Sequence, residues 1–556
     1  MDLSRRAFTG GAASLALAGS WTGRAVAQVT ALAPPSYASA IAAVAAYAER
    51  HRRYFNLPGL TLGLTVPGGP SLVQNFGFAN AETRSPAGPE TLWQIGSISK
   101  LMTAALIHQL AAEGKLALSD RVSQHLPTIP LPQGNDITVQ NLLDHVAGLP
   151  ADAPLFPPGG LWQGFRPGAR WSYSNTGYDI LGKLAEHSGG KPLARLLEER
   201  IFAPLGMSHT KGAITAEDRL RYAQGYEAAV NDIPYSRGSS LTPASWVDVT
   251  FAAGSIGSTS EDMNKLLRSI ADAAQGRGGV GLSPAAARTW AQHSVATDTP
   301  ALRYGNGLMH LTAGNRSYLH HTGGMVAFSS AFHIDKASGI GAFASSSLSG
   351  YAAYRPRLLT MFAVDALAAA RAGRPIPAPP PIEARIDHVR DFTGSYAGPL
   401  GRFEVRPVAG LTLFADGVSA PLELAGDDVF HTTHPKYRDF ALAFERKARL
   451  VVGASWGSSS FIRDGQTYAP PPSDPTVARL AGRYVSDSPW FGTAMIVERG
   501  GKLWFGTEVP LIPVDGGRYR LGADTWSPER GWFDDPIDGR PQTFYFSGEK
   551  FVRHDV

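Results

Sequence analysis

The sequence predicts an α+β domain, in which helices flank an antiparallel sheet, followed by two small antiparallel β-barrel domains. Three observations support this prediction. Runs typical of strands occur near both ends of the first two thirds of the chain, with helical and loop-rich sequence between them. A proline-rich segment at 373–386 then separates off a tail of short β-type runs. This tail repeats itself at offsets of 88 to 91 residues.

The length and composition are those of an ordinary folded protein with several domains. The chain has 556 residues, of which 44% are hydrophobic and 18% charged. A formal charge of +4 gives no support to a nucleic-acid partner. The absence of cysteine excludes disulfides, thiolate metal sites and a cysteine nucleophile. No compact metal-ligand spacing and no nucleotide-binding fingerprint occurs, so we expect neither a metal nor a cofactor.

The first 27 residues resemble a twin-arginine export signal. Arg5 and Arg6 precede a short apolar stretch that ends in a small-x-small site, with cleavage expected after Ala27. The apolar stretch is too short and too polar to span a bilayer of about 30 Å, and no other stretch is long enough. We therefore expect a periplasmic or secreted protein without an integral membrane span once the signal is removed.

Residues 28–372 are expected to form the α+β domain. Apolar residues recur at helical spacing over 37–50. Two β-type runs, 59–66 and 71–80, surround a Gly/Pro turn and predict a hairpin. Further strands are expected at 304–311, 317–324, 327–334 and 339–346. A final helix is expected from about 357 to 370.

The tail is predicted to contain two copies of one barrel. Residues 373–386 form a semi-rigid linker, because prolines fix φ and lack a backbone donor. The copies are expected at 387–470 and 471–556. Four matches recur in order, pairing Tyr396 with Tyr484, GLTLF at 410–414 with GKLWF at 501–505, Pro421 with Pro510, and Phe461 and Arg463 with Phe551 and Arg553.

A candidate nucleophile lies in the S-x-x-K pattern from Ser97 to Lys100. Apolar residues at helical spacing follow, so Ser97 is expected at a helix N-terminus with Lys100 on the same face. A lysine buried there would have a lowered pKa and could activate the hydroxyl. A second match, Ser208 to Lys211, is followed by no apolar helix. Taken alone, the pattern is better explained by a helix-capping serine with a solvated lysine.

Two further motifs follow in the chain. Tyr173-Ser174-Asn175 offers a phenol and an amide, and His321-Thr322-Gly323-Gly324 lies between two predicted strands. Singly, a packed tyrosine and a structural histidine are the simpler explanations. Taken with the motif at Ser97, however, the two follow a known order of catalytic motifs, in which S-x-x-K comes first, a polar triplet second and K-T-G third.

Longer segments extend this match, namely TLWQIGSISK, LLDHVAGLP, GARWSYSNTGYDILGKLAEHSGG, IFAPLGMSHT, GSIGSTSEDM and HHTGG. On these motifs, residues 37 to 370 resemble the serine β-lactamase and penicillin-binding protein superfamily. The resemblance is to its class C-like branch, which includes D-aminopeptidases and esterases. It implies a β-lactamase-like catalytic domain that hydrolyses its substrate through an acyl-serine.

The resemblance also implies roles for individual residues. Ser97 would be the acylated nucleophile, and Lys100 its activating neighbour. Tyr173 would carry the proton to and from the leaving group. Asn175 would hold the substrate carbonyl or the lysine, and His321 would replace the third-motif lysine. Whether Lys100 or Tyr173 takes the first proton stays open.

An oxyanion hole is implied as well. The backbone amides of Ser97 and Gly324 would bind the developing oxyanion, with Gly323 beside them against the substrate. Losing one such donor typically reduces the rate by about 10² to 10³.

Histidine in place of the third-motif lysine binds a substrate carboxylate less firmly. This disfavours β-lactam hydrolysis and carboxypeptidase activity. We therefore expect a D-aminopeptidase-like hydrolase of small amide or short-peptide substrates. A carboxylesterase or acyltransferase with the same site is an alternative, and so is a covalent sensor or binding module without turnover. In D-aminopeptidases, the tail is thought to reach the cleft and limit substrate size. The oligomeric state is not predicted.

Overall fold

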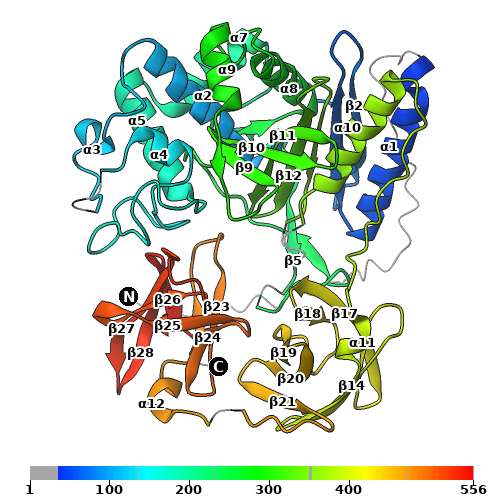
Figure 1. Ribbon diagram of the computed structural model, residues 1–556, viewed down its shortest axis with the longest axis vertical. Helices are drawn as coiled ribbons and strands as arrows, with labels where there is room; N and C mark the ends of the chain where they lie inside the picture. Colours follow the sequence, from blue (N-terminus) through cyan, green and yellow to red (C-terminus); the bar gives the residue numbers. More distant parts are fainter. Residues whose placement is uncertain are drawn as a thin grey trace.

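The computed structural model describes residues 35–132, 134, 136–230, 232–349, 354–470 and 472–554 (Figure 1). The predicted export signal at residues 1–27 lies outside the described residues.

A nine-stranded sheet forms the centre of the first domain, in the order β3-β2-β1-β13-β12-β11-β10-β9-β8. The predicted hairpin of β1 and β2 is present, and β1 also pairs antiparallel with β13, the strand of this sheet that comes last in the sequence. The sheet is thus assembled from sequence-distant strands, as expected for this fold class. The strands are β1 (Gly59–Thr65), β2 (Ser71–Asn80), β3 (Ser85–Pro86), β8 (Val295–Ala296), β9 (Leu302–Gly305), β10 (Leu308–Ala313), β11 (Arg316–Met325), β12 (Phe328–Asp335) and β13 (Gly341–Ser346).

Helices cover both faces of the sheet (Figure 1). Leu62 of β1 belongs to one hydrophobic core, which α1 and α10 complete. Its neighbour Gly63 faces the other way, where a Cβ would lie 2.6 Å from the amide oxygen of Asn264 in α8. This alternation gives the domain two cores, one on each side of the sheet. The long helices are α1 (Pro35–Tyr54), α2 (Ser99–Ala112), α5 (Asn175–Gly189), α8 (Ser260–Ala274), α9 (Pro284–Gln292) and α10 (Arg357–Arg371).

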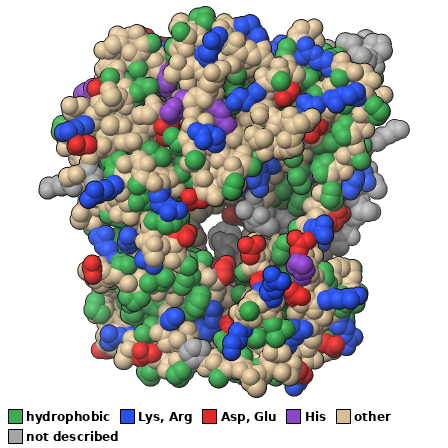
Figure 2. All heavy atoms as spheres, viewed as in Figure 1, with side chains coloured by type: hydrophobic (Ala, Val, Ile, Leu, Met, Phe, Trp, Pro, Cys, Tyr) green, Lys and Arg blue, Asp and Glu red, His purple; other side chains and the backbone are tan. Residues whose placement is uncertain are grey.

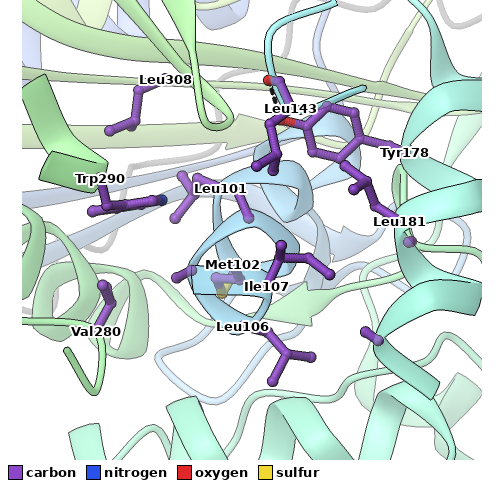
Figure 3. Close-up of a cluster of buried hydrophobic side chains, with 14 of the residues drawn as sticks. Leu101, Met102, Leu106, Ile107, Leu143, Tyr178, Leu181, Val280, Trp290 and Leu308 are labelled. Atoms are coloured by element: carbon purple, nitrogen blue, oxygen red, sulfur yellow. Dashed lines mark hydrogen bonds between the residues drawn. The ribbon is translucent and has the colours of Figure 1, made fainter. Parts of the chain in front are cut away.

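Helix α2 runs through the middle of the second core (Figure 3). Every residue of this helix from Ser99 to Leu110 is buried. Its Leu101, Met102, Leu106 and Ile107 contribute to a cluster that also contains Trp290 of α9. A helix packed on all sides has little freedom to shift. The residues at its start are therefore held in place by the core.

One strand prediction was wrong. Residues 304–311 were expected as a single strand, but they contain the end of β9, a turn and the start of β10. Asn306 and Gly307 both have positive φ, at 53° and 77°. An Asn-Gly pair with two positive φ values is the preferred two-residue turn of a hairpin.

The tail forms two closed eight-stranded barrels, which confirms the predicted fold class. Residues 374–386 have no helix or strand and lead from α10 toward the first barrel. Matching tyrosines donate to the carbonyl four residues earlier, Tyr396 to Phe392 and Tyr484 to Leu480, both at 2.8 Å. The repeated residues thus have the same structural role in both copies.

The first barrel comprises β14 (Gly394–Gly398), β15 (Gly401–Arg406), β16 (Thr412–Ala415), β17 (Val418–Gly426), β18 (Val429–Thr432), β19 (Leu442–Lys447), β20 (Leu450–Trp456) and β21 (Ser459–Arg463). The second comprises β22 (Gly482–Val485), β23 (Thr493–Arg499), β24 (Lys502–Phe505), β25 (Val509–Pro513), β26 (Arg518–Leu521), β27 (Arg530–Ile537), β28 (Arg540–Phe546) and β29 (Glu549–Arg553). Shorter elements include α3 (Val122–His125), α4 (Val139–Leu143), α6 (Leu193–Leu197), α7 (Ala203–Leu205), α11 (Val389–Phe392), α12 (Pro475–Ala478), β4 (Trp93–Gln94), β5 (Tyr226–Ala228), β6 (Leu241–Pro243), β7 (Gly257–Ser258) and the 3₁₀ turn η1 (Gly96–Ile98).

The barrels lie side by side against one end of the first domain (Figure 1). Figure 2 shows a hollow where the three parts meet, with acidic side chains at its rim. Within the described ranges, no helix is long and apolar enough to cross a membrane. The same residues contain no group of three His, Asp or Glu side chains that could hold a metal ion.

Candidate active site

Ser97 lies in the 3₁₀ turn η1, two residues before α2 begins at Ser99, and so at the helix N-terminus where it was expected. The turn depends on Gly96, whose φ is +55°. A Cβ on Gly96 would lie 2.8 Å from the backbone nitrogen of Gly324 in β11. Glycine is therefore required both for the conformation and for the close approach of the two backbones. This approach brings Ser97 next to the H-T-G-G strand.

Lys100 is the centre of the site. Its side chain is completely buried, and its amine donates to the Ser97 hydroxyl at 3.1 Å. The same amine donates to Asn175 Oδ1 at 2.6 Å and to the Ala253 carbonyl at 2.8 Å. Burial lowers the pKa of Lys100 from 10.5 to about 7. The negative charges of Asp179 and Asp152 raise this pKa, but by less than burial lowers it. In its neutral form the amine has two N–H groups and a lone pair, and a lone pair beside the Ser97 hydroxyl can accept its proton.

Tyr173 precedes α5 and has a hydrogen-bonding contact with Ser97. The Lys100 amine lies 4.9 Å from the centroid of the Tyr173 ring. Burial raises the pKa of Tyr173 well above its usual value of 10, and the contact with Ser97 offsets only part of this shift. The phenol is therefore neutral at physiological pH and can donate a hydrogen bond or a proton.

Asn175 is the first residue of α5, and the preceding Ser174 caps that helix by accepting from the Gly177 amide. The Asn175 carboxamide is held at both ends. Its Oδ1 accepts from Lys100, and its Nδ2 donates to Asp152 at 2.6 Å. The orientation of the amide is thus set by its neighbours, with oxygen toward the lysine.

The structure places His321 near the cluster but bonds it elsewhere. The ring centroids of His321 and Tyr173 are 6.4 Å apart. Its Nδ1 donates to the Thr322 carbonyl at 2.6 Å, which leaves Nε2 as an acceptor facing the Tyr304 hydroxyl at 3.5 Å. Burial lowers the pKa of His321 to about 3, with the charge on Lys100 as a further cause. The imidazole is therefore neutral.

The two glycines of the third motif occupy different places. Gly324 lines the same cleft as Ser97. Gly323, in the same strand, instead faces the backbone just before η1, where a Cβ would lie 1.9 Å from the Ile95 carbonyl oxygen. The amides of Ser97 and Gly324 come from a turn and a strand that touch through Gly96, an arrangement suited to an oxyanion hole.

Asp179 belongs to the site but was missed from sequence. It lies one helical turn after Asn175, and its Oδ1 accepts from the Ala253 amide at 3.0 Å. The carbonyl of that same residue accepts from Lys100, so Asp179 fixes one of the three acceptors of the amine. Burial raises the pKa of Asp179. Its i+4 spacing from Asn175 was the available signal.

A cleft of about 540 Å³ opens over Ser97. One wall comes from the second barrel, which contributes a loop and one acidic residue. These are Ser488, Pro489, Trp490, Phe491 and Glu549. No local pattern in the sequence indicated that the tail would contribute them.

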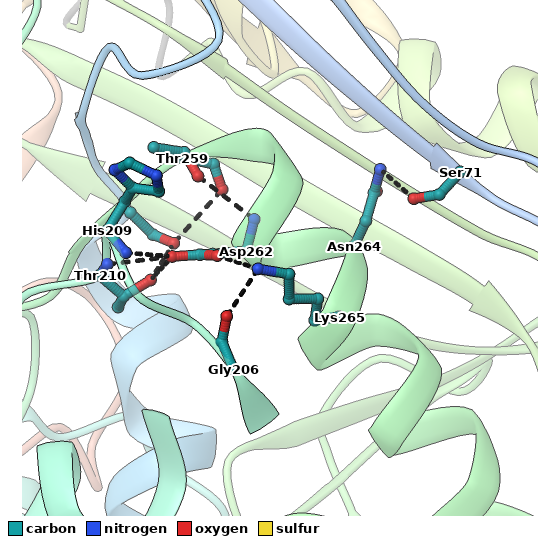
Figure 4. Close-up of polar contacts among 9 residues, drawn as sticks. Ser71, Gly206, His209, Thr210, Thr259, Asp262, Asn264 and Lys265 are labelled. Atoms are coloured by element: carbon teal, nitrogen blue, oxygen red, sulfur yellow. Dashed lines mark hydrogen bonds and ion pairs between the residues drawn. The ribbon is translucent and has the colours of Figure 1, made fainter. Parts of the chain in front are cut away.

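The second S-x-x-K match has a structural role (Figure 4). The amides of His209 and Thr210 both donate to the buried carboxylate of Asp262, at 2.9 and 3.0 Å. Lys211 forms an ion pair with Asp218 at 3.2 Å. Its amine is thus engaged away from Ser208, whereas Lys100 bonds its serine directly.

Comparisons with known proteins identify the family of the first domain. The family model described as Beta-lactamase matches residues 44–361. A Beta-lactamase of Pseudomonas fluorescens is 33% identical over 194 residues, which are 33% of this chain and 54% of the relative. Penicillin-binding protein 4* of Bacillus subtilis (strain 168) is 30% identical over 226 residues, covering 36% of this chain and 49% of the relative. The chain thus spans about half the length of the curated relatives it matches.

Solved structures show a similar fold. An octameric penicillin-binding protein homologue from Pyrococcus abyssi matches with a TM-score of 0.55 and 24% identity, over 76% of this chain and 100% of that chain. A D-amino acid amidase from Ochrobactrum anthropi SV3 matches with a TM-score of 0.50 and 24% identity, over 60% of this chain and 99% of that chain. With a family model matching more than half of its length, this chain belongs to the Beta-lactamase family of serine hydrolases.

Proposed function

We propose that the protein is a serine hydrolase that cleaves small amide or short-peptide substrates through an acyl-enzyme on Ser97. Ser97 Oγ attacks the carbonyl carbon while Lys100 accepts the hydroxyl proton. The amides of Ser97 and Gly324 bind the oxyanion. The leaving amine departs with a proton from Tyr173, which is resupplied by Lys100, and water then cleaves the acyl-serine.

The hydrogen bond between the Lys100 amine and Ser97 carries this proposal. A serine hydroxyl needs a base at neutral pH. The pKa of Lys100 is lowered toward neutrality, whereas that of Tyr173 is raised above 10. These opposite shifts favour Lys100 as the group that takes the first proton.

The charge of the cleft favours a substrate with a free amino group. Four carboxylates line it, and its described lining has no Lys, Arg or His. They are Asp152, Asp179, Glu227 and Glu549. Burial raises the pKa of Glu227, and among the described residues it has no hydrogen-bond or ion-pair partner. An ammonium group in the cleft would pair with these carboxylates and offset part of their charge. The amino end of an amino-acid amide supplies such a group. The similar D-amino acid amidase supports the same substrate class.

The test compares D-alanine p-nitroanilide, its N-acetyl derivative and a p-nitrophenyl ester on the full chain, with Ser97→Ala as the inactive control. Cleavage of the free anilide is expected to exceed that of the acetylated one, because acetylation removes the positive charge. Robust ester cleavage without any anilide cleavage would replace this proposal by the carboxylesterase or acyltransferase alternative.

A covalent sensor of the penicillin-binding type would give a different result. Intact-protein mass spectrometry would then show a persistent adduct without turnover. We further propose export by the twin-arginine route, which is tested by processing of the full-length chain after Ala27.

A further inference from the structure

We propose that Glu529 of the second barrel is a positioning residue for the catalytic site, a role that rests on the proposed function. Its Oε1 accepts from the backbone amide of Ala151 at 2.8 Å, across 378 residues of sequence. Glu529 lies immediately before β27, whereas Ala151 lies in the loop that precedes Tyr173 and α5. The bond thus joins the barrel to the loop that leads to Tyr173 and Asn175.

A single residue, Ala151, separates Glu529 from Asn175, which holds the lysine. The Ala151 carbonyl accepts from the amides of Asn175 and Thr176, at 2.7 and 3.2 Å. Because the first amides of a helix lack partners within the helix, this carbonyl anchors the start of α5. Asn175 Oδ1 then accepts from Lys100 at 2.6 Å. The connection therefore runs from Glu529 through Ala151 and Asn175 to Lys100.

Glu529 is itself held firmly. The buried hydroxyl of Ser547, in the turn between β28 and β29, donates to its Oε2. The next residue, Gly548, packs on the same loop as Ala151, where a Cβ would lie 3.0 Å from Pro154 Cδ. Glu549 then lines the cleft. One barrel turn thus supports Glu529, touches the loop and forms part of the cleft wall.

Neighbouring contacts keep the barrel in register with this loop. Trp162 Nε1 donates to the Pro528 carbonyl at 2.7 Å. A Cβ on Gly164 would lie 2.3 Å from the Trp526 carbonyl oxygen, so the two backbones touch there. Glu529 therefore cannot move without the loop. Removing its carboxylate would leave the Ala151 amide without its acceptor in a partly buried interface.

The experiment compares Glu529→Ala, Glu529→Gln and Asp232→Ala in the full chain. Gln retains an acceptor for the Ala151 amide and a donor for Ser547. Asp232 provides the matched control, because it docks the same barrel through Arg483 and Thr493, at 2.6 and 2.7 Å, without touching the Ala151 loop. Two quantities are measured, the acylation rate of Ser97 by a p-nitrophenyl ester and hydrogen–deuterium exchange of the amides of Asn175 and Thr176.

Glu529→Ala is expected to slow acylation roughly 10- to 100-fold with little change in KM, since a small displacement of a catalytic group has effects of this size. It should also accelerate exchange at the start of α5. Glu529→Gln should restore both quantities, and Asp232→Ala should leave both near wild type. If Asp232→Ala matches Glu529→Ala, the barrel acts by docking alone and the proposal is overturned.

Should Glu529→Ala fail to fold, Ser547→Ala releases Oε2 while keeping the carboxylate, and it should produce smaller shifts in the same directions. The exchange measurement does not depend on turnover. Unchanged exchange in every Glu529 and Ser547 variant therefore refutes the positioning role, whatever the activity of the wild type. A wild type that hydrolyses neither the p-nitrophenyl ester nor the anilide would count separately against the proposed function.

Discussion

The amine of Lys100 lies 3.1 Å from the hydroxyl of Ser97, and nothing of the lysine side chain is exposed to solvent. Under the proposed function, the pairing of a buried amine with a serine hydroxyl gives both residues a chemical role. It also makes each of them testable by a single substitution.

Replacing Lys100 by Ala should lower kcat for the anilide by roughly 10² to 10⁴, the usual contribution of a general base. The hydroxyl of Ser97 would remain, but no neighbouring amine could accept its proton. The matched control is Lys211→Ala in the second S-x-x-K motif, whose amine pairs with Asp218 on the surface. Equal losses in the two variants would remove the distinction between the motifs.

The acylation rate should fall as the pH drops below about 7. Lys100 acts as a base only when neutral, and its lowered pKa means that the neutral form dominates above that value. Protonation at lower pH removes the base, so the rate declines on the acid side. Single-turnover rates across pH 5 to 9 measure this limb. A rate that is flat to pH 5 would contradict the role of Lys100.

Gly96→Ala should disrupt the site by moving η1 away from β11. The new Cβ would meet the Gly324 backbone, and the positive φ alone costs about 1 kcal/mol or more. Gly114→Ala is the control, because its φ of +72° is similar but a Cβ there meets nothing within 4 Å. Thermal unfolding and acylation rates measure both effects. Only Gly96→Ala should lose activity beyond its loss of stability; identical behaviour of the two variants would show that the contact with Gly324 is unimportant.

Trp490→Ala should widen the range of substrates. Trp490 of the second barrel lines the cleft, and its ring centroid lies 5.8 Å from that of Phe251. Removing the indole opens room for larger groups, so kcat/KM for an anilide with a bulky side chain should rise about 10-fold relative to D-alanine. Trp504→Ala, in the same barrel but outside the cleft lining, should leave the ratio unchanged. A lower ratio in Trp490→Ala would mean that the indole binds substrate instead of excluding it.

Local patterns predicted much of the fold and the core of the site. S-x-x-K identified Ser97 and Lys100, because residues three apart share a helix face. The repeat identified both barrels, because matching residues such as Tyr396 and Tyr484 keep matching bonds. The β9–β10 hairpin was missed although its Asn306-Gly307 pair is the usual sequence signal for a two-residue turn.

Contacts between distant segments were beyond the reach of these patterns. The bond between Glu529 and Ala151 joins two loops that are far apart in the sequence and show no periodicity. The partners of His321 were likewise unpredictable, since Tyr304 faces it only because β9 and β10 fold back beside β11. Asp179 was also missed, although its i+4 spacing from Asn175 was visible in the sequence.

The identity of the acylated residue is the most direct test of the whole account. The enzyme is mixed with a p-nitrophenyl ester, quenched in acid within one turnover, digested and mapped by mass spectrometry. The account predicts an acyl group on the peptide containing Ser97, absent from Ser97→Ala and still forming when Ser208 is replaced by Ala. An acyl group on another residue, or undiminished hydrolysis by Ser97→Ala, would contradict it.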